Sequence, residues 1–244
     1  MANDDGIHAP GLRALLDALA GLGTLSIVAP HIERSGTAQS ITLRQPIAVE
    51  QIAENEWAIE GTPTDGVILA LHKLLPSPPD LVVSGINRGA NMGENVYYSG
   101  TLGAAMEGVI NGIPAMAISL MCRMPECRYE HAARFSRRMV ELVLKEGLPP
   151  DVLLNINVPN EWSGRVRFAR QSRKITRTLL REGFDATGRP CFWLQEQPVS
   201  EADPETDYAA CFAGDIAVTP LVLDRTDTAS LNHLSRWIEL LEER

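Results

Sequence analysis

The sequence predicts a single α/β domain built around a mostly parallel sheet. Short runs rich in Val, Ile and Ala alternate along the chain with stretches in which apolar residues have helical spacing, the order expected of consecutive βα units. The most apolar run, residues 80–87, shows no alternation and is typical of a central strand covered on both faces. With 244 residues, 45% of them hydrophobic, the chain can bury one large core.

In the first half, apolar strands and helices follow one another in turn. The expected strands are residues 24–30, 41–43, 47–49, 56–60 and 80–87. The expected helices are residues 12–19, 67–75 and 102–108. Pro46 interrupts the hairpin of the second and third strands, and Thr64 or Asp65 is the expected N-cap of the second helix.

The second half contains two features outside this regular alternation. After a strand at 115–120, a helix at about 129–146 and a strand at 151–158, the pattern becomes alternating and charged from residue 165 to 194, which predicts a β-hairpin. The last element, residues 228–242, is an amphipathic helix that needs a surface to dock against. One domain, 1–244, is therefore expected, with its core at about 1–160, a hairpin excursion at about 165–195 and a C-terminal segment at about 196–244.

Composition excludes several classes of protein. The formal net charge is -9 and the pI is about 5.1, which argues against a binder of polymeric nucleic acid. The basic run from Arg167 to Arg181 is either a solvated hairpin face or a nucleic-acid arm, and we favour a hairpin used for subunit contact. No run approaches the roughly 20 apolar residues of a membrane span, and no signal peptide pattern is found. We therefore expect a cytoplasmic protein without membrane contact.

The four cysteines are scattered, without C-x-x-C spacing or histidines beside them. They are Cys122, Cys127, Cys191 and Cys211. Such spacing indicates neither a zinc site nor a disulfide framework, so reduced structural cysteines are expected.

The turn Asn3-Asp4-Asp5-Gly6 is the first candidate site. Adjacent carboxylates repel each other unless a cation or a ring of donors compensates their charge. Ligands of open α/β sheets bind outside the carboxyl ends of the strands, so this pair points to a hard divalent cation. The alternative is that Asp4 and Asp5 only turn the loop and cap the following helix.

Two further loops follow strand ends and carry hydroxyl and amide groups. One contains Ser35 and Gly36, and the other runs from Asn87 through Asn91. If the strands that precede these loops and the Asp-Asp turn are neighbours in one parallel sheet, their side chains converge on one edge. The converging oxygen ligands, suited to a hard cation, are Asp4, Asp5, Ser35 and Asn87.

The turn Ser99-Gly100-Thr101 opens a helix and is a candidate phosphate site. It offers free backbone N–H groups, two hydroxyls and the positive end of a helix dipole. It is not a Walker A loop, and the chain lacks the dinucleotide fingerprint in its first βα turn. An ordinary capped helix is the alternative.

Taken together, these motifs resemble the SurE family, the survival-protein E nucleotidases. The resemblance runs in order through almost the whole chain. It rests on residues 3–7, 28–36, 40–43, 61–65, 84–89, 98–101, 155–159, 206–207 and 218–221. Family members usually begin with an apolar strand before the Asn-Asp-Asp turn, whereas this chain has only Met1-Ala2 there. We therefore expect the first strand to be a stub, unless the start codon is placed too late.

The resemblance implies a metal-dependent 5'-nucleotidase that removes phosphate from nucleoside monophosphates, with some members also acting on 3'-nucleotides or short polyphosphate. It implies a Rossmann-like three-layer fold, a protruding hairpin, and a C-terminal segment exchanged in a homodimer or homotetramer. The implied cofactor is one divalent metal ion, Mn²⁺ or Mg²⁺. The implied metal ligands are Asp4, Asp5, Ser35 and Asn87, with Asp4 and Asn3 catalytic. The expected phosphate or substrate contacts are Asn3, Gly36, Asn91, Ser99, Gly100 and Thr101.

The expected mechanism is metal-assisted hydrolysis of a phosphomonoester by a bound water. A route through an aspartyl-phosphate on Asp4 ranks second. His8 is either a proton donor or, more simply, a surface residue. The competing function is a non-catalytic nucleotide- or metal-binding module, and a dehydrogenase is disfavoured by the missing fingerprint.

Overall fold

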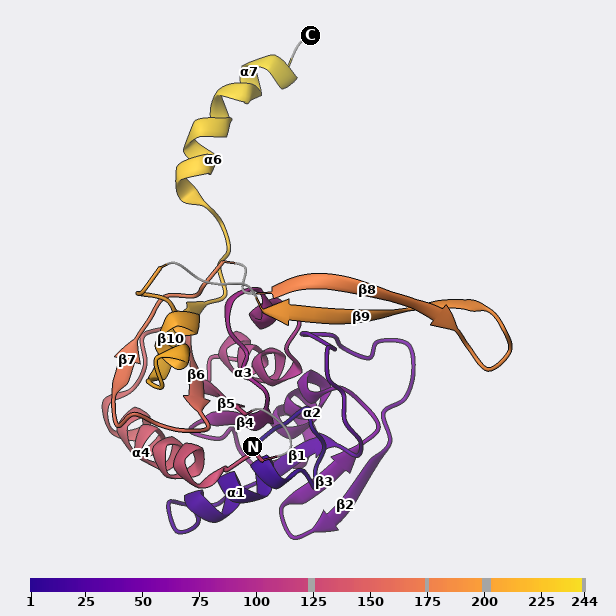
Figure 1. Cartoon of the computed structure of the whole chain (residues 1–244). Helices are drawn as coiled ribbons and strands as arrows, with labels where there is room; N and C mark the ends of the chain where they lie inside the picture. The colour runs from indigo at the N-terminus through magenta and orange to yellow at the C-terminus, as the bar shows by residue number, and fades with distance from the viewer. Residues whose placement is uncertain (123–125, 174–175, 199–202, 243–244) are drawn as a thin grey trace.

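The computed structural model describes residues 1–122, 126–173, 176–198 and 203–242. Figure 1 shows an α/β body from which a hairpin and a C-terminal helical arm project. The body contains a five-stranded sheet in the order β4-β5-β6-β10-β7 and a three-stranded sheet in the order β1-β3-β2, and β8 and β9 form the hairpin. An α/β fold with a mostly parallel sheet was predicted from the sequence and is confirmed.

The element bounds agree with the predicted order over most of the chain. The strands are β1 (Ile27–Pro30), β2 (Val49–Ala53), β3 (Glu56–Ile59), β4 (Val82–Arg88), β5 (Ala115–Met121), β6 (Val152–Pro159), β7 (Val166–Phe168), β8 (Thr176–Phe184), β9 (Pro190–Pro198) and β10 (Ile216–Val222). The helices are α1 (Pro10–Leu19), α2 (Pro63–Leu69), η1 (Ala70–Leu74), η2 (Gly93–Tyr97), α3 (Gly100–Ile110), α4 (Glu130–Glu146), α5 (Asp207–Phe212), α6 (Thr228–Leu234), η3 (Ser235–Trp237) and α7 (Ile238–Leu241).

The first two residues connect the two sheets of the body. Ala2 donates its N–H to Val83 O at 3.0 Å, and Gly85 donates to Ala2 O at 2.9 Å. On the other side, Val28 donates to Met1 O at 3.1 Å. The stub therefore lies between β1 and β4, which belong to two sheets and not to the single parallel sheet that was predicted, and the three polar loops that follow these segments are neighbours.

Helices cover both faces of the five-stranded sheet. On β5, Met116, Ile118 and Leu120 pack in a buried cluster with α1 and α4, whereas Ala115 and Ala117 pack in a second cluster with α2 and α3. Strands β4, β5 and β6 run parallel, and β10 runs antiparallel to β6. Burial of both faces explains why these strands lack apolar–polar alternation.

Two sequence predictions around the start of α2 were wrong: the N-cap of the helix and the strand at 41–43. Thr62 is the N-cap, in a capping box with Asp65, and the helix begins at Pro63, because proline fits the first helical position. The predicted strand at 41–43 does not form. Instead Thr42 donates its N–H and hydroxyl to the Asp65 carboxylate at 2.9 and 2.6 Å. The strand after Pro46 starts at Val49.

The hairpin is shorter at its start than predicted. Residues 166–168, placed in the predicted excursion, pair with β10 in the main sheet. The first cations of the basic run belong to the body. Arg167, together with Arg165 just before the run, faces Asp215, and Arg170 pairs with Asp203. Lys174, also in that run, lies outside the described residues. The hairpin that remains exposes large apolar side chains along its length: Leu179, Leu180, Phe184, Phe192, Trp193 and Leu194.

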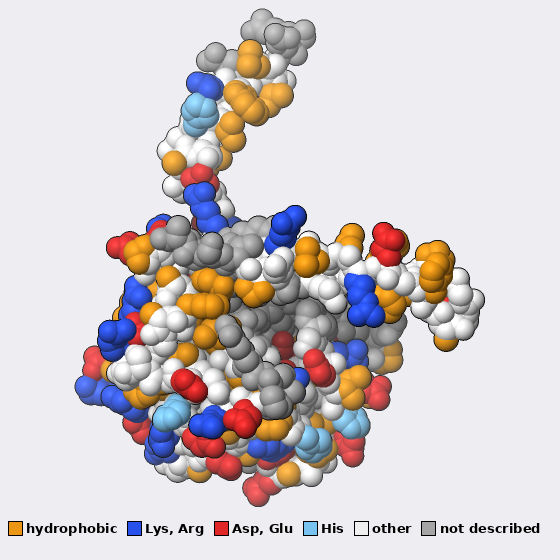
Figure 2. All heavy atoms as spheres, in the orientation of Figure 1, with side chains coloured by type: hydrophobic (Ala, Val, Ile, Leu, Met, Phe, Trp, Pro, Cys, Tyr) orange, Lys and Arg blue, Asp and Glu red, His pale blue; other side chains and the backbone are white. Residues whose placement is uncertain are grey.

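The C-terminal arm is helical, as predicted, with a 3₁₀ turn between α6 and α7. Figure 2 shows apolar side chains along one side of this arm, away from the body. They come from exposed residues that include Leu231, Leu234, Trp237, Ile238 and Leu241. The arm has a surface suited to docking and does not bury it within the described chain.

The cysteine prediction was wrong in one respect. Cys122 and Cys127 form a disulfide, whereas Cys191 and Cys211 are free. The two bonded cysteines are five residues apart, a spacing that carries no disulfide signal in the sequence, so only the fold brings them together. None of the described helices is long and apolar enough to cross a membrane.

The start of α1 approaches β4 very closely. A Cβ added to Gly11 would lie 2.0 Å from Ile86 O and 2.8 Å from a ring carbon of Tyr129. At this point the register between β4 and β5 shifts, between Ser84 and Asn87. Only glycine leaves room for the β4 backbone, and this contact fixes α1 against the strand that leads to Asn87.

We predict that Gly11→Ala lowers the free energy of unfolding by about 1–3 kcal/mol, because the added methyl group overpacks a backbone contact. Urea titration monitored by circular dichroism measures the change. Gly23→Ala is the matched control, because a Cβ at Gly23 meets nothing within 4 Å. Equal unfolding midpoints for the two variants would contradict the close approach of α1 and β4.

Candidate active site

The Asn3-Asp4-Asp5-Gly6 turn lies at the carboxyl edge of the sheet. Asn3 and Asp4 are buried, and Asp5 is half-buried. Gly6 has φ +103°, which allows the chain to reverse so that Ile7 donates its N–H to Pro30 O at 2.9 Å. Two carboxylates are therefore held side by side against the end of β1.

Burial dominates the electrostatics of this pair. Desolvation raises the pKa of Asp4 to about 6, opposed by a hydrogen bond of 2.5 Å from the Thr101 hydroxyl to Asp4 Oδ1. Desolvation also raises the pKa of Asp5, and the Arg88 N–H, which donates to Asp5 Oδ2 at 2.8 Å, lowers it. Without a cation, the site therefore favours protons on its carboxylates.

The N-terminus of α3 lies directly against Asp4. A Cβ on Gly100 would lie 3.0 Å from Asp4 Cβ and 3.0 Å from the Thr37 hydroxyl oxygen. Ser99 is the N-cap of α3, and its hydroxyl accepts the Leu102 N–H at 3.2 Å. Ser99 therefore caps the helix, and its contact with phosphate stays a prediction. The cap also leaves the first backbone N–H groups of the helix facing the carboxylate.

The loop after β1 closes over the same turn. Arg34 donates its N–H to Asp4 O at 2.7 Å, and the Thr37 hydroxyl donates to Arg34 O at 2.8 Å. Ser35 and Gly36 lie between them, exposed. The Ser35 hydroxyl donates to Glu33 at 2.7 Å, and Gly36 adopts φ +74°.

The end of β4 supplies the third loop. The Asn87 side chain donates to Gly89 O at 2.8 Å, and this leaves its amide oxygen to accept. Because the next residue, Arg88, hydrogen-bonds to Asp5, Asn87 lies beside the carboxylate pair. Asn91 is different, since its side chain donates to Ser119 at 2.9 Å within a buried network, and no described contact joins it to Asp4.

Several buried polar atoms around the site make no hydrogen bond of standard geometry among the described residues. These are both side-chain atoms of Asn3 and the Arg34 Nε, although the Asn3 side chain lies close enough to Asp5 to lower the pKa of that carboxyl. An unpaired buried donor costs free energy unless a ligand or water satisfies it. The atoms are therefore suited to an anion or a hydrated ion at this position.

The oxygen set fits a hard divalent cation. Within the described part of the chain, no three His, Cys, Asp or Glu residues form a cluster that could hold a metal. A site here therefore depends on two carboxylates completed by neutral oxygens, the ligand type that Mg²⁺ and Mn²⁺ accept. The donor set and the shared negative charge are consistent with the predicted cofactor.

Sequence reasoning missed three neighbours of the site. Thr37 and Arg34 came from the right loop, but nothing in their spacing distinguishes them from Ser35. Tyr129 could not have been found from the sequence, since it precedes α4 and its ring contacts Gly11. Burial, and then the charge of Asp5, raise the pKa of Tyr129. His8 is exposed.

Comparison with known proteins identifies the family. The family profile described as Survival protein SurE matches residues 1–178. The chain belongs to the SurE family. Proteins named 5'-nucleotidase SurE are similar over almost the full length of this SurE chain. One from Desulforudis audaxviator is 44% identical over 247 residues, covering 97% of this chain and 96% of its own, and one from Geotalea uraniireducens is 41% identical over 241 residues, covering 97% of each.

A solved SurE structure gives the same result for the fold. The crystal structure of the SurE protein from Aquifex aeolicus is similar with a TM-score of 0.86 and 37% identity, covering 99% of this chain and 98% of that one. The resemblance found in the sequence motifs is therefore confirmed for fold and family.

The raised pKa of Asp4 predicts a pH-dependent stability of the metal-free protein. Asp4 binds its proton more tightly in the folded than in the unfolded chain, so its stabilising contribution is complete below about pH 4 and is lost as the pH rises through about 6. The expected loss is about 3 kcal/mol, at roughly 1.4 kcal/mol for each pH unit. Urea unfolding at a series of pH values measures it.

Asp4→Asn should remove the Asp4 contribution between pH 4 and 6 and leave only the part of the dependence that comes from the raised pKa of Asp5. Asp185→Asn is the control and should keep the whole dependence, because the Thr187 hydroxyl and neighbouring N–H groups lower the pKa of Asp185 to about 2, below that window. A slope that persists unchanged in Asp4→Asn would refute the burial of the Asp4 charge.

Proposed function

We propose that this chain is a metal-dependent phosphomonoesterase that hydrolyses nucleoside 5'-monophosphates to nucleoside and phosphate. The observation that carries the proposal is the contact between the Asp4 carboxylate and the N-terminus of α3, which combines a cation-binding group with an anion-binding one. The activity in the names of the full-length relatives agrees with it. A non-catalytic nucleotide- or metal-binding module is the alternative.

Asp4, Asp5, Ser35 and Asn87 would hold the cation. To bind the cation, the Ser35 hydroxyl would give up its hydrogen bond to Glu33. The Asn87 side-chain nitrogen is already fixed by its bond to Gly89 O, which leaves the amide oxygen of Asn87 for the cation. When bound, Mn²⁺ or Mg²⁺ supplies a Lewis acid that polarises a phosphoryl oxygen and makes a water more acidic. The proposed set contains no soft ligand, which disfavours copper.

The remaining phosphate oxygens would be bound by donors of this chain. Gly100 and Thr101 carry the first N–H groups of α3, at the helix N-terminus, where the helix dipole attracts anions. The buried Asn3 amide and the exposed Gly36 N–H would add donors from the other two loops. Such preorganised donors stabilise charge that develops on the phosphoryl group during transfer. Asn91 would act by holding the loop between β4 and α3, since its side-chain amide is already used.

Two routes for the attack on phosphorus remain, and attack by water is favoured. The Asp4 carboxylate accepts the Thr101 hydroxyl and is crowded by Gly100, which limits its freedom to become phosphorylated. Asn3, next to it, would orient the phosphoryl group. Hydrolysis of 3'-nucleotides and of short polyphosphate is a secondary proposal, because these substrates end in the same dianionic phosphoryl group.

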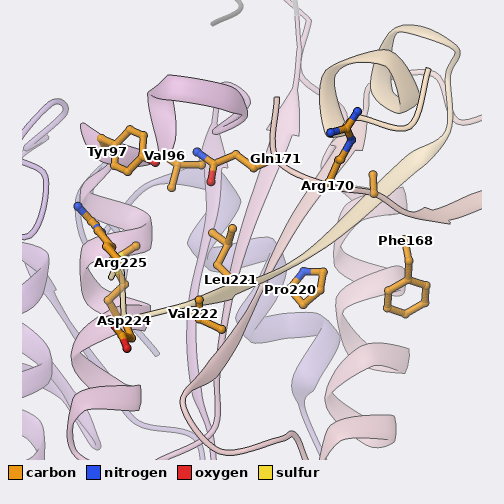
Figure 3. A pocket seen from close by; sticks show the side chains of 12 residues that line it. Val96, Tyr97, Phe168, Arg170, Gln171, Pro220, Leu221, Val222, Asp224 and Arg225 are labelled. Carbon is orange, nitrogen blue, oxygen red and sulfur yellow. The ribbon is translucent and has the colours of Figure 1, made fainter. Parts of the chain in front are cut away.

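The exposed apolar surfaces support a homodimer or homotetramer. A groove of about 680 Å³ on the body is lined by side chains from η2, α3, β10 and the segment after β7 (Figure 3). Leu221 and Val222 lie along its floor, and Arg225 stacks over Tyr97 at 5.0 Å at one side. We propose that the C-terminal arm of one copy packs against a partner and that the hairpin adds a second contact. A cytoplasmic location without membrane contact accompanies this proposal.

The proposed activity is tested by phosphate release from a nucleoside 5'-monophosphate. We expect release with Mn²⁺ or Mg²⁺ and none after chelation. Asp5→Asn should fold normally and bind Mn²⁺ at least about tenfold more weakly, because it removes a charge that only the cation requires. Asp17→Asn, on the exposed face of α1, is the control. Nucleotide binding without phosphate release would support the non-catalytic alternative.

The assembly is tested by removing the hairpin. Thr176 and Pro198 are paired across β8 and β9, so residues 177–197 can be replaced by a short turn without separating the ends. The expected result is a smaller particle in light scattering, with Mn²⁺ affinity retained because the metal ligands lie in the first half of the chain. An unchanged particle mass would rule the hairpin out as an essential contact.

A further inference from the structure

We infer that Glu94 is a positioning residue that connects the base of the hairpin to the phosphate-binding N-terminus of α3. The inference extends the proposed function and rests on it, because it concerns the site that would bind the substrate phosphate. It places a further determinant of phosphate binding at Thr176, the partner of Glu94, in the second half of the chain and far in sequence from the metal ligands.

The loop between β4 and α3 is held by partners from distant segments. Asn91 O accepts the side-chain N–H groups of Asn155 and Asn157 at 2.8 and 3.0 Å. Gly93 donates its N–H to Asp207 at 3.3 Å, and Gly93 O accepts from Gln171 at 2.7 Å. The course of this loop is therefore set from outside, by residues 64 to 114 positions away.

Glu94 makes the connection to the hairpin. Its Oε1 accepts both the backbone N–H and the hydroxyl of Thr176, at 2.8 and 2.6 Å. Thr176 is the first residue of β8, and both side chains are half-buried. A carboxylate oxygen that accepts two donors fixes the direction of the strand as well as its distance, because both bonds must be satisfied together.

The segment from Glu94 to α3 is short and hydrogen-bonded along its length. Glu94 lies in η2, which ends at Tyr97; Tyr98 donates its N–H to Asn95 O at 3.1 Å and accepts the Ala38 N–H at 3.0 Å. The next residue is the α3 N-cap, Ser99. A shift of Glu94 is therefore carried directly to Ser99–Thr101.

The position of the hairpin consequently affects phosphate binding more than metal binding. Asp4 and Asp5 follow the stub that pairs with β1 and β4, and Asp5 is also bonded to Arg88, so a movement of η2 reaches the carboxylates only through the bond from Thr101 to Asp4. Binding of a second copy along the hairpin would hold β8 in one direction and thereby order the phosphate site. Assembly and phosphate binding are coupled through one carboxylate.

The test compares Glu94→Ala, Glu94→Gln and Thr176→Val with the wild-type full chain. Glu94→Gln keeps an acceptor oxygen, whereas Thr176→Val keeps the N–H donor and removes the hydroxyl. Glu141→Ala is the control, since Glu141 forms an exposed pair with Arg137 on α4. For each variant we would measure two affinities, one for inorganic phosphate with saturating Mn²⁺ and one for Mn²⁺ alone. We would also measure kcat and KM for a nucleoside 5'-monophosphate and the amide hydrogen exchange of residues 93–101.

Glu94→Ala should weaken phosphate binding and lower kcat/KM by about tenfold, through misplacement of the α3 N-terminus. It should speed exchange in residues 93–101 and leave Mn²⁺ affinity within about twofold of the wild-type value. Glu94→Gln should restore most of the phosphate affinity, Thr176→Val should fall between, and the Glu94→Ala effect should shrink in the Thr176→Val background because the two residues form one contact.

Unchanged phosphate affinity and exchange in Glu94→Ala would overturn the inference, as would Glu94→Gln behaving like Glu94→Ala. An equal loss of Mn²⁺ affinity would reduce Glu94 to a general structural role and would also overturn it. A wild-type chain that binds phosphate and releases none from nucleotides would refute the proposed function alone, because the exchange and phosphate-binding comparisons remain decisive for Glu94.

Discussion

The contact between the Asp4 carboxylate and the first turn of α3 is the constraint on which the site depends. It requires a helix N-terminus to reach a buried acid, and Gly100 permits the approach because any side chain there would meet Asp4 and Thr37. Gly103, one turn later, lies as close to the backbone of Ala38 and Gln39. The small residues of α3 thus serve the close fit of helix, turn and loop.

How much of this was predictable differs between the fold and the site. The alternation of strands and helices follows from apolar periodicity, and the edge on which the loops meet follows from the parallel order of the strands. The Thr62 cap was missed because Thr64 and Asp65 offer equally good side chains locally, and only the contact of Asp65 with Thr42 decides among them. The predicted strand at 41–43 does not form because Thr42 bonds to the Asp65 carboxylate, a tertiary contact that no local pattern shows, and does not pair in a sheet.

Within the site, residue types were predictable and their states were not. Asp4 and Asp5 are visible as an acidic pair, but their raised pKa values depend on burial, which no local pattern encodes. Asn87 and Asn91 come from one predicted loop, yet the Asn91 side chain bonds to Ser119 in a buried network, whereas the Asn87 side chain bonds to Gly89 O, next to the Arg88 N–H that reaches Asp5. The contact of Tyr129 with Gly11 joins segments more than a hundred residues apart and leaves no trace in spacing.

The apolar hairpin and arm tie the behaviour of the molecule to its concentration. A chain that leaves Phe192, Leu194 and Ile238 in water gains free energy by burying them in any partner that fits. In the assembly proposed above, binding of a second copy follows mass action, so dilution would separate the copies. A separated chain would keep its projecting elements unsupported and would be open to proteases and to adventitious association at the same exposed strands.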